Sequence, residues 1–153
     1  MRKAVLLSIS LVMTSLTGLP ALGWEHSLED LGDGNSLSFV RATDAFGWAD
    51  LTIGCVMGSG AIAIELISED DPVDEQMGEV TFSVAGTSFT VPARLGGTNG
   101  IFLAWADGEA VWDVVRAIYG SEGEVALDVM GDTHFFGGAN YSDAFGAMMD
   151  SCA

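Results

Sequence analysis

Apolar and polar residues alternate along much of the segment 36–105, and this period of two is the feature that most restricts the fold. Successive side chains of a β-strand point to opposite faces, so the alternation predicts half-buried antiparallel strands. Glycine-containing segments at 58–60 and 85–87 suit hairpin turns between them. The alternating apolar sets are Leu37 and Phe39; Leu51, Ile53 and Cys55; Ile62, Ile64 and Leu66; Val80, Phe82 and Val84; Phe89 and Val91; Ile101, Leu103 and Trp105.

The period changes after residue 106. Residues 107–119 are predicted to form a helix, with Asp107 as its N-cap and Gly120 at its end. Strands are expected again at 124–130 and 133–136, and Ser142 predicts the start of a short final helix. The expected fold is therefore α+β: mainly antiparallel β, as a sandwich or barrel-like sheet, with two short helices in one domain. The helix prediction rests on the spacing of Val111, Val114, Val115 and Ile118.

The first 23 residues have the pattern of a secretory signal peptide. Arg2 and Lys3 precede a mostly apolar stretch at 4–16, and Ala21 and Gly23 are small residues ahead of a cut before Trp24. The stretch is too short for a membrane span, and a new N-terminal Trp24 offers no cysteine for a lipid anchor. We therefore expect residues 1–23 to be removed and residues 24–153 to form one periplasmic or secreted domain, monomeric or weakly associating.

Cys55 and Cys152 are the two cysteines of the chain. Export to an oxidising compartment would allow a disulfide between them, closing a loop of roughly 100 residues and fixing the C-terminus to a strand. The alternative is a redox-active pair, which requires neighbouring cysteines or a thiolate activated by nearby cations. The distance in sequence and the scarcity of basic residues favour the structural bridge.

The chain is strongly acidic, with 22 Asp and Glu against five Lys and Arg. After residue 23 the basic residues are Arg41, Arg94 and Arg116, while all 22 acids remain, so the mature net charge is −19. Nucleic acid and anionic lipid surfaces would repel such a protein. Two interpretations stay open: a cationic partner, such as a basic or envelope protein, or solubility in salty surroundings.

Several chemistries lack the residues that they need. No lysine follows Lys3, which excludes a Schiff-base lysine, a phosphate-loop lysine and a serine–lysine dyad in the mature chain. Residues 58–63 fit the dinucleotide pattern G-x-G-x-x-A, but a strand-like run follows where a helix is required, so a hairpin is expected. No cofactor is predicted.

Metal binding is not predicted either. Residues 29–35 contain acids and glycines, as a calcium-binding loop does. If Gly34 is aligned with the turn glycine of such a loop, however, Leu31 and Val40 fall at positions that require ligands. Two histidines and two cysteines expected in a disulfide do not make a closed zinc site. The segment 68–78 contains five acids and is expected to be a solvated loop. The alternative is loose calcium binding by four of them, Asp70, Asp71, Asp74 and Glu75.

No catalytic residue is predicted. Asp132 and His134 fall on one strand face, where the carboxylate could orient the imidazole, but neither a G-x-S-x-G nor an H-E-x-x-H motif supplies a nucleophile or metal. The remaining enzyme hypothesis is a carboxylate-dependent hydrolase, since acid–base catalysis needs only Asp and Glu with separated pKa values.

Two surfaces are candidates for binding a partner. One is a helix stripe of Trp112, Arg116 and Tyr119, in which Trp112 and Arg116 are spaced for a cation–π pair. The other is the acidic loop with Asp70, Asp71, Asp74 and Glu75. They predict a non-enzymatic accessory or binding protein, or, as an alternative, an acidic inhibitor of a basic wall-degrading enzyme such as lysozyme.

The order of motifs in the C-terminal half resembles small exported proteobacterial proteins of the invasion-associated locus B type, and is similar to periplasmic proteins associated with type VI secretion. The resemblance implies a β-rich exported accessory domain, bracketed by a strand cysteine and a C-terminal cysteine, with no assigned active site. Its residues are Leu51-Thr52-Ile53-Gly54-Cys55, then His134-Phe135-Phe136-Gly137-Gly138, Ser142, Ala144-Phe145 and Cys152.

Overall fold

A computed structural model describes residues 23–32, 34–121 and 124–153. The expected signal peptide, residues 1–23, lies outside this part of the chain except for Gly23. Among the described residues, no helix has both the length and the apolar character needed to cross a membrane.

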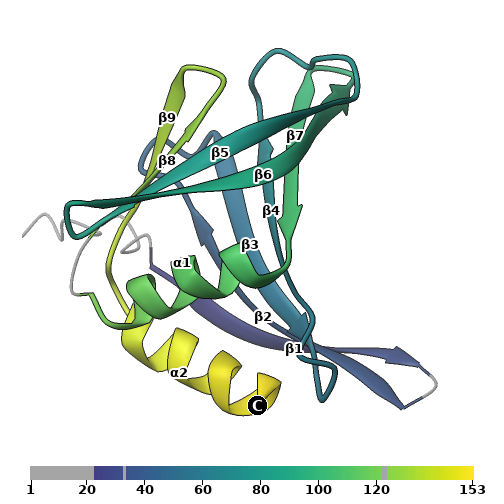
Figure 1. Ribbon diagram of the computed structural model, residues 1–153, viewed down its shortest axis with the longest axis vertical. Helices are drawn as coiled ribbons and strands as arrows, with labels where there is room; N and C mark the ends of the chain where they lie inside the picture. Colours follow the sequence, from purple (N-terminus) through teal and green to yellow (C-terminus); the bar gives the residue numbers. More distant parts are fainter. Residues whose placement is uncertain (1–22, 33, 122–123) are drawn as a thin grey trace, which may run out of the picture.

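Nine strands of the described residues form one sheet in which every pairing is antiparallel, in the order β1-β2-β3-β4-β7-β6-β5-β8-β9. The sheet curls into a half-barrel, and the two helices lie in its concave side (Figure 1). The elements are β1 (Glu25–Gly32), β2 (Asn35–Thr43), β3 (Ala49–Val56), β4 (Ile62–Ser68), β5 (Gln76–Val84), β6 (Thr87–Thr98), β7 (Ile101–Asp107), α1 (Glu109–Tyr119), β8 (Val125–Val129), β9 (Asp132–Phe136) and α2 (Tyr141–Cys152).

The structure confirms the expected fold class, and the barrel-like alternative describes the sheet better than a sandwich does. In β3, β4 and β5 the predicted apolar sets face the helices and are buried. Strand β1 was not predicted, because most of its residues are exposed and polar and its sequence does not alternate. It forms through backbone pairing with β2 at the edge of the sheet.

In two strands, the apolar residues that were predicted to be buried lie on the outer face of the sheet instead. In β2, Ser38, Val40 and Ala42 are buried, while Leu37 and Phe39 point outward. Ser38 is tolerated inside because its Oγ is 2.9 Å from Nε2 of His26 on β1. In β7 the buried residues are Phe102, Ala104 and Ala106, so Ile101, Leu103 and Trp105 lie on the outer face.

Both predicted helix N-caps are wrong by one or two positions. Asp107 is the last residue of β7; the N-cap of α1 is Gly108, whose φ of 93° turns the chain directly from strand to helix. Ser142 lies inside α2, whose N-cap is Asn140 in a left-handed conformation. The chain must turn there because the carbonyl of the preceding Ala139 accepts a hydrogen bond from the backbone N–H of Trp24 (3.0 Å).

Trp24 anchors the start of the described domain in the core. It is 1% exposed, and its ring lies 4.8 Å from Phe145 of α2 and 6.2 Å from Phe136 of β9. Burying three aromatic side chains in contact is a large apolar contribution to stability. The predicted helix residues Val111, Val114, Val115 and Ile118 of α1 are buried in the same core.

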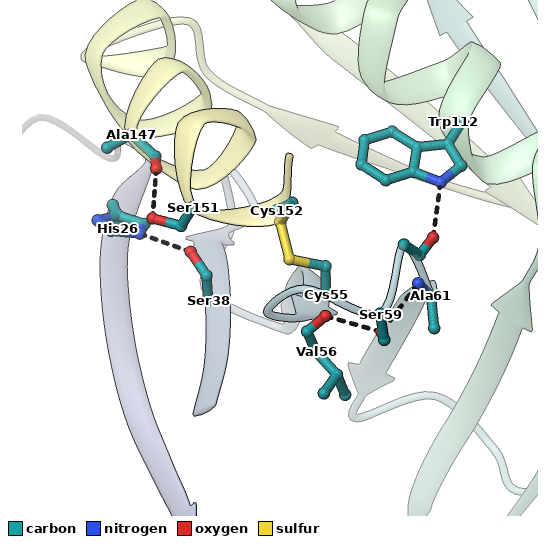
Figure 2. Close-up of a disulfide and its surroundings, with 11 residues drawn as sticks. His26, Ser38, Cys55, Val56, Ser59, Ala61, Trp112, Ala147, Ser151 and Cys152 are labelled. Carbon is teal, nitrogen blue, oxygen red and sulfur yellow. Dashed lines mark hydrogen bonds between the residues drawn. A yellow bond between two sulfur atoms is a disulfide. The ribbon is translucent and has the colours of Figure 1, made fainter. Parts of the chain in front are cut away.

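The predicted disulfide joins Cys55 of β3 to Cys152 at the end of α2 (Figure 2), with a Cα–Cα distance of 5.9 Å. Both cysteines are buried, and α2 is thereby fixed against the concave face of the sheet. The described residues contain no free cysteine.

We expect replacement of both cysteines by serine to lower the free energy of unfolding by at most about 4.7 kcal/mol, the chain-entropy value for a loop of this size. Guanidinium unfolding of the variant and of the oxidised chain measures the loss. The intact mass of the untreated chain should lack a pair of hydrogens relative to the reduced chain; free thiols in freshly isolated protein would contradict the bridge.

Candidate functional site

A buried polar cluster surrounds His134, which lies on the inner face of β9. Its Nδ1 is 3.4 Å from Oδ2 of Asp44, and its Nε2 is 3.1 Å from Oδ2 of Asp70, although the second contact lacks the alignment of a hydrogen bond. Asp132, the partner considered from the sequence, is exposed and is not among these contacts. The carboxylate beside the imidazole therefore comes from Asp44, in the turn between β2 and β3.

This cluster ties three segments of the chain together. Asp44 Oδ1 also accepts hydrogen bonds from the backbone N–H groups of Trp48 (2.8 Å) and Ala49 (3.2 Å). The hydroxyl of Ser68 donates to Asp70 (2.5 Å) and not to the imidazole. Since the hydroxyl is not paired with the imidazole, the cluster does not have the nucleophile–base contact of a hydrolase. Its contacts give it a structural role.

The four acids that were predicted as a partner surface in the loop between β4 and β5 do not converge. Asp70 turns inward to Ser68 and His134, whereas Asp71 is exposed. Asp74 and Glu75 line a cleft on the outer face of the sheet. Within the part of the chain that the structure describes, no group of three or more His, Cys, Asp or Glu side chains is placed to hold a metal ion.

The three residues of the helix stripe also contact different parts of the structure. Arg116 pairs with Asp113 (2.8 Å) and Glu109 (3.4 Å), so the expected stacking on Trp112 does not form. Two carboxylates on the same helix hold the guanidinium more strongly than one indole would. Tyr119 lies toward Gly146 of α2.

Trp112 points away from its stripe, toward the hairpin between β3 and β4. Its Nε1 donates to the carbonyl oxygen of Gly60 at 3.2 Å (Figure 2). Ser59 shapes this turn, because its Oγ donates to the carbonyl of Val56 (2.8 Å) and accepts from the N–H of Ala61 (3.0 Å). The indole is thus held in a defined orientation.

The outer face of the sheet carries apolar residues that the core does not use, which we call the outer band. Leu37 is paired with Val56 across β2 and β3, and Ile67 with Leu103 across β4 and β7. Phe39 is paired with Gly54, where an added Cβ would come within 2.8 Å of the Phe39 Cβ. These side chains lie on the face of the sheet away from the helices. The outer band consists of Leu37, Phe39, Val56, Ile67, Leu103 and Trp105.

Two clefts open on this face, and Trp105 lines both. The loop cleft, of about 570 Å³, lies beside the acidic loop and is lined by Asp74, Glu75, Arg94 and Leu103. The helix cleft, of about 480 Å³, lies beside the start of α1. The larger side chains that line it include Leu37, Val56, Trp105, Asp107, Glu109 and Trp112.

Arg94 of β6 is paired with Trp105 of β7, and its guanidinium carbon lies 5.2 Å from the centre of the Trp105 ring. This is a cation–π contact between neighbouring strands. Neither residue was predicted from the sequence to belong to a site. A signal was present, since residues 101–106 are apolar without alternation, and such a strand is expected to be covered on both faces.

A second charged pair lies on the outer face near Ile67. Asp50 accepts hydrogen bonds from Arg41 Nη2 (2.5 Å) and Thr43 Oγ1 (2.6 Å). Partial burial by itself would raise the pKa of Asp50. The two hydrogen bonds and the charge of Arg41 outweigh it and place the pKa below the ordinary value of 3.8.

Asp44→Ala is expected to lower the free energy of unfolding by about 1–3 kcal/mol, because it leaves buried N–H groups without their acceptor. Asp132→Ala, which removes an exposed carboxylate from the strand of His134, should change it by less than about 0.5 kcal/mol. Urea unfolding compares the two. A loss for Asp132→Ala as large as that for Asp44→Ala would contradict the assignment of the structural contacts to Asp44 alone.

A lowered carboxyl pKa in the folded state stabilises the protein above the unfolded pKa, and this contribution is lost as the pH falls through the folded value. The difference in melting temperature between the natural chain and Asp50→Asn should therefore be constant from about pH 5 to 7 and shrink below about pH 4. The control Glu29→Gln removes an exposed carboxylate and should show no such loss. A difference that persists at low pH would contradict the stated cause.

The chain shows no significant similarity to a known protein family, to a curated protein or to a solved structure. The resemblance described from the sequence motifs therefore stays a prediction, and the site is argued from its own geometry.

Proposed function

We propose that this chain is an exported, non-enzymatic binding protein of the bacterial envelope that docks a basic protein partner on the outer face of its sheet. The observation that carries the proposal is the outer band with carboxylates around it. Glu65 is paired with Trp105 across β4 and β7, and Asp107 and Glu109 border the helix cleft. Asp74 and Glu75 border the loop cleft.

The two components of this surface would contribute differently to binding. Burying Ile67 and Leu103, which are 41% and 37% exposed, would remove apolar area from water and supply affinity. The carboxylates would steer a cationic protein toward the face and repel an anionic one, with an association rate that falls as salt rises. A surface evolved only for solubility needs the charge but not the apolar band.

The proposed location in the envelope rests on the sequence of residues 1–23 and on motifs that resemble those of exported proteobacterial proteins. The disulfide agrees with this location, because such bonds persist in oxidising compartments.

The rival functions receive less support. An inhibitor that inserts the acidic loop into a lysozyme cleft needs a loop that projects, but Asp70 is turned inward. A carboxylate-dependent hydrolase needs two carboxyl groups facing each other across a bound substrate. Asp74 and Glu75, the acids of the loop cleft, are adjacent in the sequence and line it together with Arg94.

Photo-crosslinking tests the proposed surface. A photoreactive residue replacing Ile67 should form an adduct with a basic protein in envelope extract of the producing cells, and the yield should fall between about 50 and 150 mM salt. The same residue at Leu28, which is 61% exposed on β1, is the matched control and should form no such adduct.

The captured protein must then be purified and bound in isolation. Ile67→Ser and Leu103→Ser are expected to weaken its binding several-fold without changing the fold, since both side chains are outside the core. Equal adducts at positions 28 and 67, or capture of an acidic protein only, would contradict the proposal. Capture of a lysozyme together with loss of its lytic activity would favour the inhibitor.

A further inference from the structure

We infer that the helix cleft is a recognition pocket for an arginine side chain of the basic partner. This inference rests on the proposed function, which it makes more specific. It joins three observations: two fixed indoles, two carboxylates at the mouth, and an arginine of the chain itself held in the same manner in the neighbouring cleft.

The aromatic walls of the helix cleft are positioned before any ligand arrives. Trp105 is held in β7 between β4 and β6, with Glu65 and Arg94 as its cross-strand neighbours. Trp112 also lines the cleft and is oriented by its hydrogen bond to the carbonyl of Gly60. A flat guanidinium stacks on an indole, and walls that are already ordered reduce the entropy lost on binding.

The mouth of the cleft is negatively charged. Asp107 ends β7 and Glu109 begins α1, so the turn at Gly108 places two carboxylates at one border of the cleft. Asp107 has no ion-pair partner among the described residues, and Glu109 makes one contact, at 3.4 Å, with Arg116. A cation that enters the cleft therefore meets carboxylates whose charge is mostly unpaired.

The loop cleft brings an arginine of the chain itself, an indole and two carboxylates to one site. There the guanidinium of Arg94 lies over Trp105, and Asp74 and Glu75 line the same cleft. Among the described residues that line the helix cleft, none is lysine or arginine. The Trp105 ring already has the Arg94 guanidinium over it, so the indole that the helix cleft offers to an arginine from a partner is that of Trp112, beside the carboxylates of Asp107 and Glu109.

Peptides with a single altered side chain test the pocket on the oxidised chain expressed with its own N-terminus. Acetyl-Gly-Arg-Gly-amide is compared with the citrulline peptide, which has nearly the same shape without the charge, and with the lysine peptide. The indole N–H resonances of the four tryptophans report the position of binding. The arginine peptide should shift the signals of Trp105 and Trp112 and leave those of Trp24 and Trp48 unchanged.

We expect the arginine peptide to bind at least about fivefold more tightly than the citrulline peptide, the ratio that one exposed cation–π contact and two exposed carboxylates supply together. The lysine peptide should lie between them, because its ammonium does not stack as a plane. Equal binding of citrulline, or shifts centred on Trp48, would overturn the inference. So would tighter binding of a chito-oligosaccharide, which also stacks on indoles, at the same tryptophans.

Variants of the two carboxylates at the mouth of the helix cleft separate an effect on binding from an effect on folding. Asp107→Asn and Glu109→Gln should each lower the affinity for the arginine peptide at least about twofold. The double variant should lose most of its preference for the arginine peptide over the citrulline peptide. Glu29→Gln, an exposed carboxylate far along β1, is the matched control and should change nothing. These variants leave the half-buried Trp112 intact, so the test does not depend on the stability of a tryptophan variant.

The two proposals fail differently. If the basic partner still binds the outer band while the arginine peptide leaves Trp105 and Trp112 unshifted, the arginine pocket is wrong and the proposed function stands. If neither the partner nor the peptide binds, both are wrong.

Discussion

The curl of the sheet depends on a few contacts that join its far strands. β9 stands at one end of the strand order, yet its Phe135 carbonyl accepts a hydrogen bond (2.8 Å) from Ala45, in the turn after β2. The buried contact of Asp44 with His134 lies beside it. At the other edge, the N–H of Trp24 donates to Ala139. These links hold the sheet around α1 and α2, and the disulfide fixes α2 inside (Figure 1).

The sequence predicted which residues share a strand face more reliably than it predicted which face is inside. Alternation identifies the two faces, but only the packing decides between them when both carry apolar residues, as in β7. In β2, the burial of Ser38 depends on its contact with His26. His26 lies on β1, a strand that could not be predicted because its sequence does not alternate. The helix starts were displaced because backbone turns at Gly108 and Asn140 replaced side-chain caps.

The candidate site was only partly visible in the sequence for a related reason. Trp112, Asp74 and Glu75 were identified from local composition, but the residue that links their clefts, Trp105, had been assigned only to a strand. Its pairing with Arg94 is a matter of strand register between β6 and β7, which local patterns do not define. Asp70 likewise belongs to an acidic segment in sequence but to a buried cluster in space. Contacts between distant segments create the site.

The hairpin between β3 and β4 connects the core to the outer face. Cys55 lies near the end of β3, and the turn that follows presents the Gly60 carbonyl to Trp112 (Figure 2). α1 in turn buries Val111, Val114, Val115 and Ile118 inside the sheet while Trp112 borders the helix cleft. The same helix thus fills the concave side and forms one wall of a pocket on the other. Because the core fixes α1 and a hydrogen bond from the turn orients its indole, this wall of the cleft is ordered before a ligand binds, which is the property that a site for one flat cationic side chain requires.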